Sequence, residues 1–136
     1  MLITTDADLK RLFETVRTIA VVGCSPRPER AGHYVAKYLQ DLGYRVIPVN
    51  PGQTEILGEK CYASLRDIPE PVDMIDCFRR AEDIPSIVED AIAIGAKFIW
   101  MQLGIVNDEA ARRAMEAGIE VVMDRCPKID YPRLFR

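Results

Sequence analysis

The chain has 136 residues, a formal net charge of -3 at pH 7, 49% hydrophobic residues and 29% charged residues. These values are typical of a single soluble globular domain over residues 1–136, and the acidic balance argues against a nucleic-acid-binding protein. No apolar run approaches membrane-spanning length, and the N-terminus lacks the basic and apolar regions of a signal peptide. We therefore expect a cytoplasmic protein with neither a membrane nor a nucleic-acid partner.

The cysteines are spread along the chain, at Cys24, Cys61, Cys77 and Cys126, and form no CxxC pair. Such spacing fits neither a disulfide framework nor a zinc site, so we expect reduced thiols and no bound metal.

Helical patterns alternate with apolar runs. An apolar stripe (Leu9, Leu12, Phe13, Val16) predicts a first helix, capped by Thr5 or Asp6. Further helices are expected over about residues 31–42, 82–94 and 108–117, and Asn107 caps the last of these. Strands are expected over 18–22, 45–49, 72–78, 97–103 and 120–123. In the second helix the expected inward residues are Val35, Leu39 and Leu42.

Two segments are expected to be less regular. Within residues 53–71, Lys60–Tyr62 is compatible with a short extended piece, and Ser64 with one helical turn. The tail from Asp124 contains Pro127 and Pro132 and should be mostly irregular.

Strands that alternate with helices of about ten residues imply right-handed βαβ crossovers and a parallel sheet. We predict a three-layer, doubly wound, Rossmann-like α/β fold with five parallel strands in the order 3-2-1-4-5. In that order the winding reverses between the first and fourth strands, and the ligand crevice lies there, outside the carboxyl ends of the strands.

The first strand ends at Gly23, and a polar loop up to Arg30 leads into a helix. A helix N-terminus offers unpaired N–H groups and a partial positive charge to a ligand phosphate. Ser25, Arg27 and Arg30 suit such a ligand. The alternative is structural: Gly23 makes the turn, Ser25 caps the helix and the arginines are solvated.

The same loop is not a dinucleotide fingerprint. The GxGxxG pattern needs glycine at positions 25 and 28, where the chain has Ser25 and Pro28. After the second strand an NAD site usually has an acidic residue, and here the residue is Asn50. Both departures argue against NAD.

Other strand ends carry weaker signals. Phe78 and Arg79 suit an aromatic wall and a cation of a nucleotide pocket, or a strand end with a solvated charge. His33 has no co-ligand or catalytic partner at a useful spacing, so a surface or capping role is favoured. No motif specifies a reaction.

Together these segments resemble a known family. The runs VVGCSPRPER, GYRVIPVNPG, ILGEKCYASLRDIPEPVDMIDCFRR, GAKFIWMQLGI and VVMDRCPKI resemble small stand-alone CoA-binding proteins of bacteria and archaea. Those proteins are similar to the CoA-binding domain of the succinyl-CoA synthetase α subunit. The resemblance implies CoA contacts at Gly23, Cys24, Ser25, Pro26, Arg27, Pro28, Arg30, Asn50, Pro51, Gln53, Phe78, Arg79, Met101, Gln102 and Leu103.

Within that set, the resemblance assigns the phosphates to Ser25–Pro28, the ADP end to Asn50–Gln53 and the pantetheine arm to Met101–Leu103. The synthetase domain has a lysine where this chain has Gln53, so the 3′-phosphate would rely on Arg27, Arg30 or a more distant lysine. The phosphorylated histidine domain and partner subunit of the synthetase have no counterpart here, so its chemistry is not expected.

The preferred interpretation is a non-catalytic module that binds CoA or acyl-CoA as a carrier, sensor or accessory protein. The alternatives are an NAD(P)-dependent oxidoreductase, another nucleotide-binding enzyme such as an acyl-CoA transferase, and a structural domain that has lost its ligand. A protein partner and a homo-oligomer both stay open.

A further hypothesis concerns the thiols. Cys24, Cys77 or Cys126 would form a mixed disulfide with CoA, helped at Cys24 by a pKa lowered at the helix end. The alternative is buried, inert thiols.

Overall fold

A five-stranded parallel sheet forms the centre of the protein, in a computed structural model that describes residues 1–136. In spatial order its strands are β2 (Arg45–Val49), β1 (Thr18–Val22), β5 (Met74–Cys77), β6 (Phe98–Met101) and β7 (Glu120–Val122).

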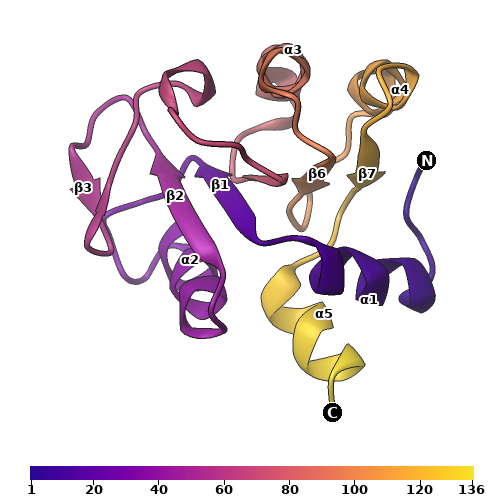
Figure 1. The fold of residues 1–136 in the computed structure, drawn as a ribbon, viewed down its shortest axis with the longest axis horizontal. Coiled ribbons are helices and arrows are strands. Elements are labelled where there is room, and N and C mark those ends of the chain that lie inside the picture. The colour runs from indigo at the N-terminus through magenta and orange to yellow at the C-terminus, as the bar shows by residue number, and fades with distance from the viewer.

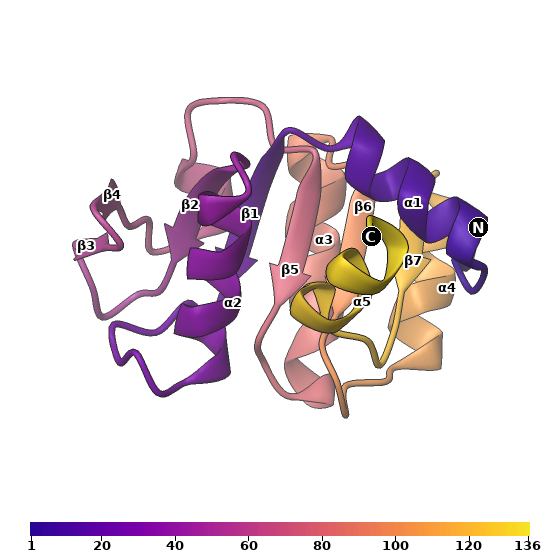
Figure 2. The same ribbon diagram turned by 90° about the horizontal axis from the view of Figure 1, so that it is seen from below.

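Helices cover both faces of this sheet. On one face lie α3 (Ile84–Ile94) and α4 (Asp108–Glu116), and on the other α1 (Asp6–Thr15), α2 (Ala31–Asp41) and α5 (Pro127–Leu134), as Figures 1 and 2 show. Each face of the sheet packs on its own apolar cluster. Both sides of the strands are therefore buried, and apolar residues do not alternate with polar ones along them. The predicted three-layer, doubly wound fold is confirmed.

The strand order differs from the prediction at one strand. β5, the third long strand, lies between β1 and β6, so the order in chain numbering is 2-1-3-4-5 instead of 3-2-1-4-5. The winding therefore reverses between β1 and β5, and the expected reversal between the first and fourth strands is wrong.

The outer edge of β2 explains this difference. There the Tyr62 N–H donates to the Pro48 carbonyl at 3.1 Å, and the Asn50 N–H donates to the Tyr62 carbonyl at 2.9 Å. Pro48 has no N–H to offer an outer strand, which is why proline in a sheet is confined to edges. Since this edge is taken, β5 pairs with the free edge of β1.

The irregular segment after β2 forms a small hairpin, β3 (Glu55–Ile56) with β4 (Glu59–Lys60), followed by the helical turn η1 (Leu65–Asp67) capped by Ser64. A second turn, η2 (Ala81–Asp83), leads into α3. The N-terminus covers the opposite edge of the sheet, where the Ile3 N–H donates to the Val121 carbonyl at 2.8 Å.

Helix α1 has the predicted Thr5 cap, and α4 begins at the predicted Asn107 cap. One inward residue of α2 is wrong: Leu42 is 37% exposed, because the helix ends at Asp41 and Leu42 is only its C-cap.

The tail is helical rather than mostly irregular. Pro127 occupies the start of α5, where a missing N–H is harmless. The Tyr131 ring stacks on Phe135 at 4.5 Å and meets the edge of Phe13 at 5.2 Å between ring centroids. This aromatic packing against α1 holds the helix even though Pro132 lies within it.

Candidate functional site

Four hollows adjoin along the carboxyl ends of the strands; the smallest, about 320 Å³, lies beside Arg79, Arg80 and Asp83, and the other three follow one another across the sheet. The loop cavity, about 360 Å³, is lined by Gly23, Ser25, Arg27, Arg30, Ala31, Gly32 and Phe78. The central cavity, about 650 Å³, is lined by Ala31, Tyr34, Phe78, Arg79, Arg80, Ala81, Gln102, Leu103, Gly104, Ile105 and Cys126. The apolar groove, about 500 Å³, is lined by Leu2, Ile3, Thr4, Leu103, Val106, Met123, Asp124, Arg125, Cys126, Ile129 and Asp130.

Strand register brings the loops together. Val22 pairs with Val49 on one side and with Cys77 on the other, so Gly23 and Phe78 leave the sheet at the same level. This level is the reversal point between β1 and β5, where open α/β sheets bind ligands.

Two glycines allow the loop after β1 to pack tightly against the end of β5 and the start of α2. A Cβ on Gly23, whose φ is +82°, would lie 2.5 Å from the Phe78 carbonyl oxygen. A Cβ on Gly32 would lie 2.6 Å from the Gly23 carbonyl oxygen. Gly32 was not among the predicted site residues, because the loop between the two glycines is longer than in a GxGxxG motif.

The start of α2 has free donors. Its N-cap, Arg30, makes no side-chain capping bond, and the N–H groups of Ala31 and Gly32 have no hydrogen-bond partner. The macrodipole and these N–H groups favour an anion at this helix end.

Polar side chains hold the loop in place from outside the cavities. His33 donates from Nδ1 to the Ser25 carbonyl at 2.8 Å, since a carbonyl oxygen only accepts. Asn50 donates from Nδ2 to the Cys24 carbonyl at 2.9 Å, and its Oδ1 accepts the Gly52 N–H at 2.9 Å. His33 and Asn50 therefore orient the loop from α2 and from the end of β2.

The arginines differ in their partners. Arg27 pairs with Glu29 at 2.9 Å, and Arg80 pairs with Glu82 at 2.9 Å. Arg30, in the loop cavity, and Arg79, in the central cavity, make no ion pair. These two cations are free to meet an anionic ligand.

The central cavity has an apolar wall and one unsatisfied acceptor. Phe78 and Tyr34 supply aromatic surface. Gln102 is only 5% exposed, and its side-chain oxygen has no hydrogen-bond donor. A buried acceptor without a partner costs about 1–3 kcal/mol. The oxygen itself is covered, so an amide N–H of a ligand would reach it, and be stabilised, after the Gln102 side chain turns toward the cavity.

Several expected contacts lie outside these cavities. Met101 and Cys24 are fully buried in the core, and Pro26, Pro28, Asn50, Pro51 and Gln53 line none of the three hollows. The expected residues that do line the loop and central cavities are Gly23, Ser25, Arg27, Arg30, Phe78, Arg79, Gln102 and Leu103.

Sequence reasoning missed Tyr34 as a lining residue of the central cavity, whereas Cys126, named in the thiol hypothesis, does line it. Tyr34 follows Arg30 by four residues, which places both on one face at the start of a helix. That spacing was the available signal.

The expected lowering of the pKa of the Cys24 thiol is wrong. Cys24 and Cys77 are fully buried, and burial raises the pKa of the Cys24 thiol to about 12. Burial also raises the pKa of Cys77. The low dielectric of the core outweighs the helix end. Only Cys126 lines a cavity, so a mixed disulfide with CoA stays a prediction for that residue alone.

Two aspartates of the β5 region serve different ends. Asp73 Oδ2 accepts the N–H groups of Arg17 and Thr18 at 2.9 and 3.0 Å, which ties the start of β1 to β5. Asp76 is fully buried with no partner for either oxygen, and burial raises the pKa of its carboxyl well above the ordinary value.

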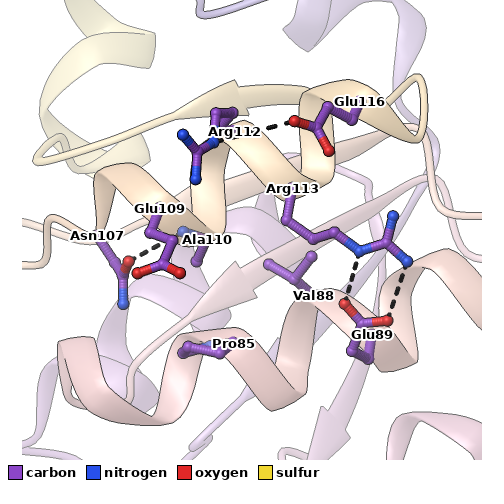
Figure 3. Close-up of a pocket in the computed structure, with 9 residues that line it drawn as sticks. All are labelled: Pro85, Val88, Glu89, Asn107, Glu109, Ala110, Arg112, Arg113 and Glu116. Carbon is purple, nitrogen blue, oxygen red and sulfur yellow. Dashed lines mark hydrogen bonds and ion pairs between the residues drawn. The ribbon is translucent and has the colours of Figure 1, made fainter.

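A further hollow of about 370 Å³ lies between α3 and α4 (Figure 3). Four of its five charged side chains are paired, Arg113 with Glu89 at 3.0 Å and Arg112 with Glu116 at 3.9 Å, and Glu109 has no ion pair. No loop from the carboxyl ends of β1 or β5 reaches it, so we assign no site there.

No cluster of three or more His, Cys, Asp or Glu side chains is arranged to hold a metal. None of the helices has the length and apolarity to span a bilayer.

Comparison with known proteins adds to this geometry. Residues 17–132 match a family model described as a CoA binding domain. The Bacillus subtilis (strain 168) protein YneT is 43% identical over 125 residues, which cover 92% of this chain and 93% of YneT. An ADP-forming acetate–CoA ligase of Archaeoglobus fulgidus is 32% identical over 130 residues, but the match spans only 18% of the ligase.

A solved structure has the same architecture over nearly the whole length of both chains. A hypothetical protein from Pyrococcus horikoshii OT3 superimposes with a TM-score of 0.95 at 42% identity, covering 98% of this chain and 94% of that one.

Proposed function

Because this chain belongs to the CoA binding domain family, we propose that it binds CoA or an acyl-CoA at the carboxyl ends of β1, β5 and β6. The observation that carries the proposal is the continuity of the loop cavity with the central cavity through Ala31 and Phe78. An elongated ligand with one anionic end and one amide-rich arm fits that shape.

The diphosphate belongs at the loop cavity. There the free N–H groups of Ala31 and Gly32 and the unpaired Arg30 face the same hollow. Hydrogen bonds from such donors to a charged phosphate are stronger than hydrogen bonds between two neutral groups. Arg30 and Arg79 are better candidates than Arg27 for the 3′-phosphate as well, because Glu29 already neutralises Arg27.

The pantetheine arm belongs in the central cavity. Its amide N–H groups match the unpaired side-chain oxygen of Gln102, and its methylenes match Phe78 and Leu103. This arrangement satisfies a buried acceptor that the free protein leaves without a donor.

A binding role without catalysis is the preferred function. Neither cavity is lined by a histidine or a carboxylate that would serve as general acid or base. We therefore propose a carrier, sensor or accessory protein. The comparison with the acetate–CoA ligase supports the ligand class, and the ligase activity itself is not proposed for this chain.

Calorimetric titration of the reduced protein with CoA, dephospho-CoA and NAD tests the proposal. We expect saturable CoA binding near one per chain, weakened by loss of the 3′-phosphate, and no comparable binding of NAD. Binding of NAD in preference to CoA would favour the oxidoreductase alternative. Binding of neither would favour a structural domain that has lost its ligand.

Arginine variants then test the proposed phosphate contacts. Arg30→Ala should weaken CoA binding by about tenfold, the size expected for losing one charge-assisted contact, and more than Arg27→Ala does. Arg112→Ala is the matched control, because Arg112 is exposed on α4 and paired only with Glu116. Equal effects of Arg30→Ala and Arg112→Ala would contradict the proposed phosphate site.

A further inference from the structure

Exposed large apolar side chains gather in one place on this protein. Of the exposed large hydrophobic residues, Leu2, Leu103, Val106 and Ile129 all line the apolar groove, with exposed fractions between 40% and 58%. They come from the N-terminal segment, the loop after β6 and α5. Apolar side chains concentrated in a hollow mark a binding surface rather than chance exposure.

The apolar groove joins the proposed CoA site. Leu103 and Cys126 line both the groove and the central cavity. Across the sheet the order is therefore loop cavity at β1 and β5, central cavity at β5 and β6, and apolar groove at β6 and β7. A CoA with its diphosphate in the loop cavity and its pantetheine arm along the central cavity would direct its sulfur toward the apolar groove.

We propose that the apolar groove binds the acyl chain of an acyl-CoA, and that the preferred ligand is a thioester of an uncharged, medium-length acyl group. This inference rests on the proposed CoA function and adds the substrate class. The groove gives the chain a volume of about 500 Å³ beyond the central cavity.

Charge in the groove decides between acyl classes. The Asp124 carboxylate accepts the Gly104 N–H at 2.7 Å, and Asp130, 4% exposed, is held by Arg125 at 3.3 Å and Arg133 at 3.0 Å. Two carboxylates and one guanidinium, that of Arg125, line the groove, and Arg133 brings a second guanidinium to Asp130, so these charges balance. An acyl group ending in a carboxylate would find no unpaired cation there and would lose hydration, whereas an aliphatic chain would pack on Leu2, Val106 and Ile129.

The groove also opens to solvent, so a segment of a partner protein is the competing occupant. One observation favours the acyl chain. The residues shared with the central cavity, Leu103 and Cys126, place the groove at the end of the proposed pantetheine path.

Calorimetric titrations with CoA, acetyl-CoA, octanoyl-CoA and succinyl-CoA test the inference. A fully buried methylene contributes about 0.8 kcal/mol, which is about fourfold in affinity, and a half-buried one about twofold. Octanoyl-CoA should therefore bind at least about tenfold more tightly than acetyl-CoA, and succinyl-CoA no more tightly than acetyl-CoA.

A charge introduced into the apolar wall tests where the acyl chain lies. Ile129→Glu places a carboxylate in the groove at a position that is 58% exposed and therefore tolerant of substitution. It should abolish the preference for octanoyl-CoA and leave the affinity for CoA within about twofold. Leu42→Glu is the matched control, because Leu42 is also exposed but lies at the end of α2, outside the groove.

Three results would overturn the inference. Equal affinities for CoA and octanoyl-CoA, with both binding, would reject the acyl groove and keep the CoA site. An octanoyl preference that survives Ile129→Glu would place the chain elsewhere. Absence of binding by CoA and octanoyl-CoA alike would reject the CoA function and the acyl groove together.

Discussion

At the scale of single residues, the loop after β1 packs closely because Gly23 and Gly32 have no Cβ. Gly23 touches the Phe78 carbonyl and Gly32 touches the Gly23 carbonyl, both at distances that no Cβ tolerates. The sequence indicates Gly23 because it ends a buried strand. It does not indicate Gly32, since a helix tolerates glycine in many contexts and the contact that requires it lies nine residues back in the chain.

Gly32→Ala tests this close packing. The added Cβ would lie 2.6 Å from a backbone oxygen, so helix and loop must separate, and we expect a loss of about 1–3 kcal/mol in the free energy of unfolding. Urea denaturation measures the change. Gly52→Ala is the control, because its Cβ would approach only the Asn50 side chain at 3.5 Å. Equal effects of the two substitutions would show that the loop adapts freely.

Asp76 gives a prediction about pH. Burial raises the pKa of this carboxyl in the folded protein, whereas an unfolded Asp has a pKa of about 3.9. The folded state thus keeps a proton that the unfolded chain releases. The free energy of unfolding falls as pH rises between these two pKa values, by up to about 1.4 kcal/mol per pH unit.

Asp76→Asn removes that slope, because the amide does not titrate. Relative to the wild type, the variant should become progressively more stable in urea denaturation as pH rises above about 5. Asp67→Asn, at an exposed position, corrects for the loss of one negative charge. A stability difference that is constant with pH would contradict a protonated, buried Asp76.

At the scale of elements, local signals located most helices and strands, and long-range pairing decided the rest. Caps at Thr5, Ser64 and Asn107 could be predicted because a capping bond lies within three residues of its acceptor. The position of β5 could not be predicted from such patterns, although Pro48 was an unused signal that β2 is an edge strand. Helix α5 was missed because its stability comes from aromatic contacts with α1, far away in sequence.

Phe13→Ala tests how α5 is held. Phe13 is 4% exposed, and its ring lies 5.5 Å from Trp100, 5.2 Å from Tyr131 and 6.2 Å from Phe135 between centroids. Removing it should lower the free energy of unfolding by about 3–5 kcal/mol and loosen α5, seen as faster amide exchange there. Leu42→Ala should change stability far less. A loss below about 1 kcal/mol, with α5 still protected, would contradict this role of Phe13.

At the scale of the whole molecule, the parallel sheet brings residues that are distant in sequence together at the carboxyl ends of its strands. The expected CoA contacts at Ser25, Arg30, Phe78, Arg79, Gln102 and Leu103 line adjoining cavities, as predicted from the rule that ligands bind at the carboxyl ends of parallel strands. Met101 ends β6 and is buried, whereas Gln102 and Leu103 lie past the end of that strand and line the central cavity. The Asn50 side chain orients the loop, and the ligand contacts expected at Met101 and Asn50 stay predictions.

The central claim is that CoA lies across this edge with its phosphates at the start of α2. Amide resonances followed by NMR during a CoA titration test it most directly. We expect the N–H signals of Ala31 and Gly32 to shift most, together with those of Phe78 and Leu103 and the side-chain amide of Gln102. Signals of Arg112 and Arg113 on α4 should stay in place. No shift at Ala31 and Gly32, or shifts confined to α3 and α4, would contradict the account.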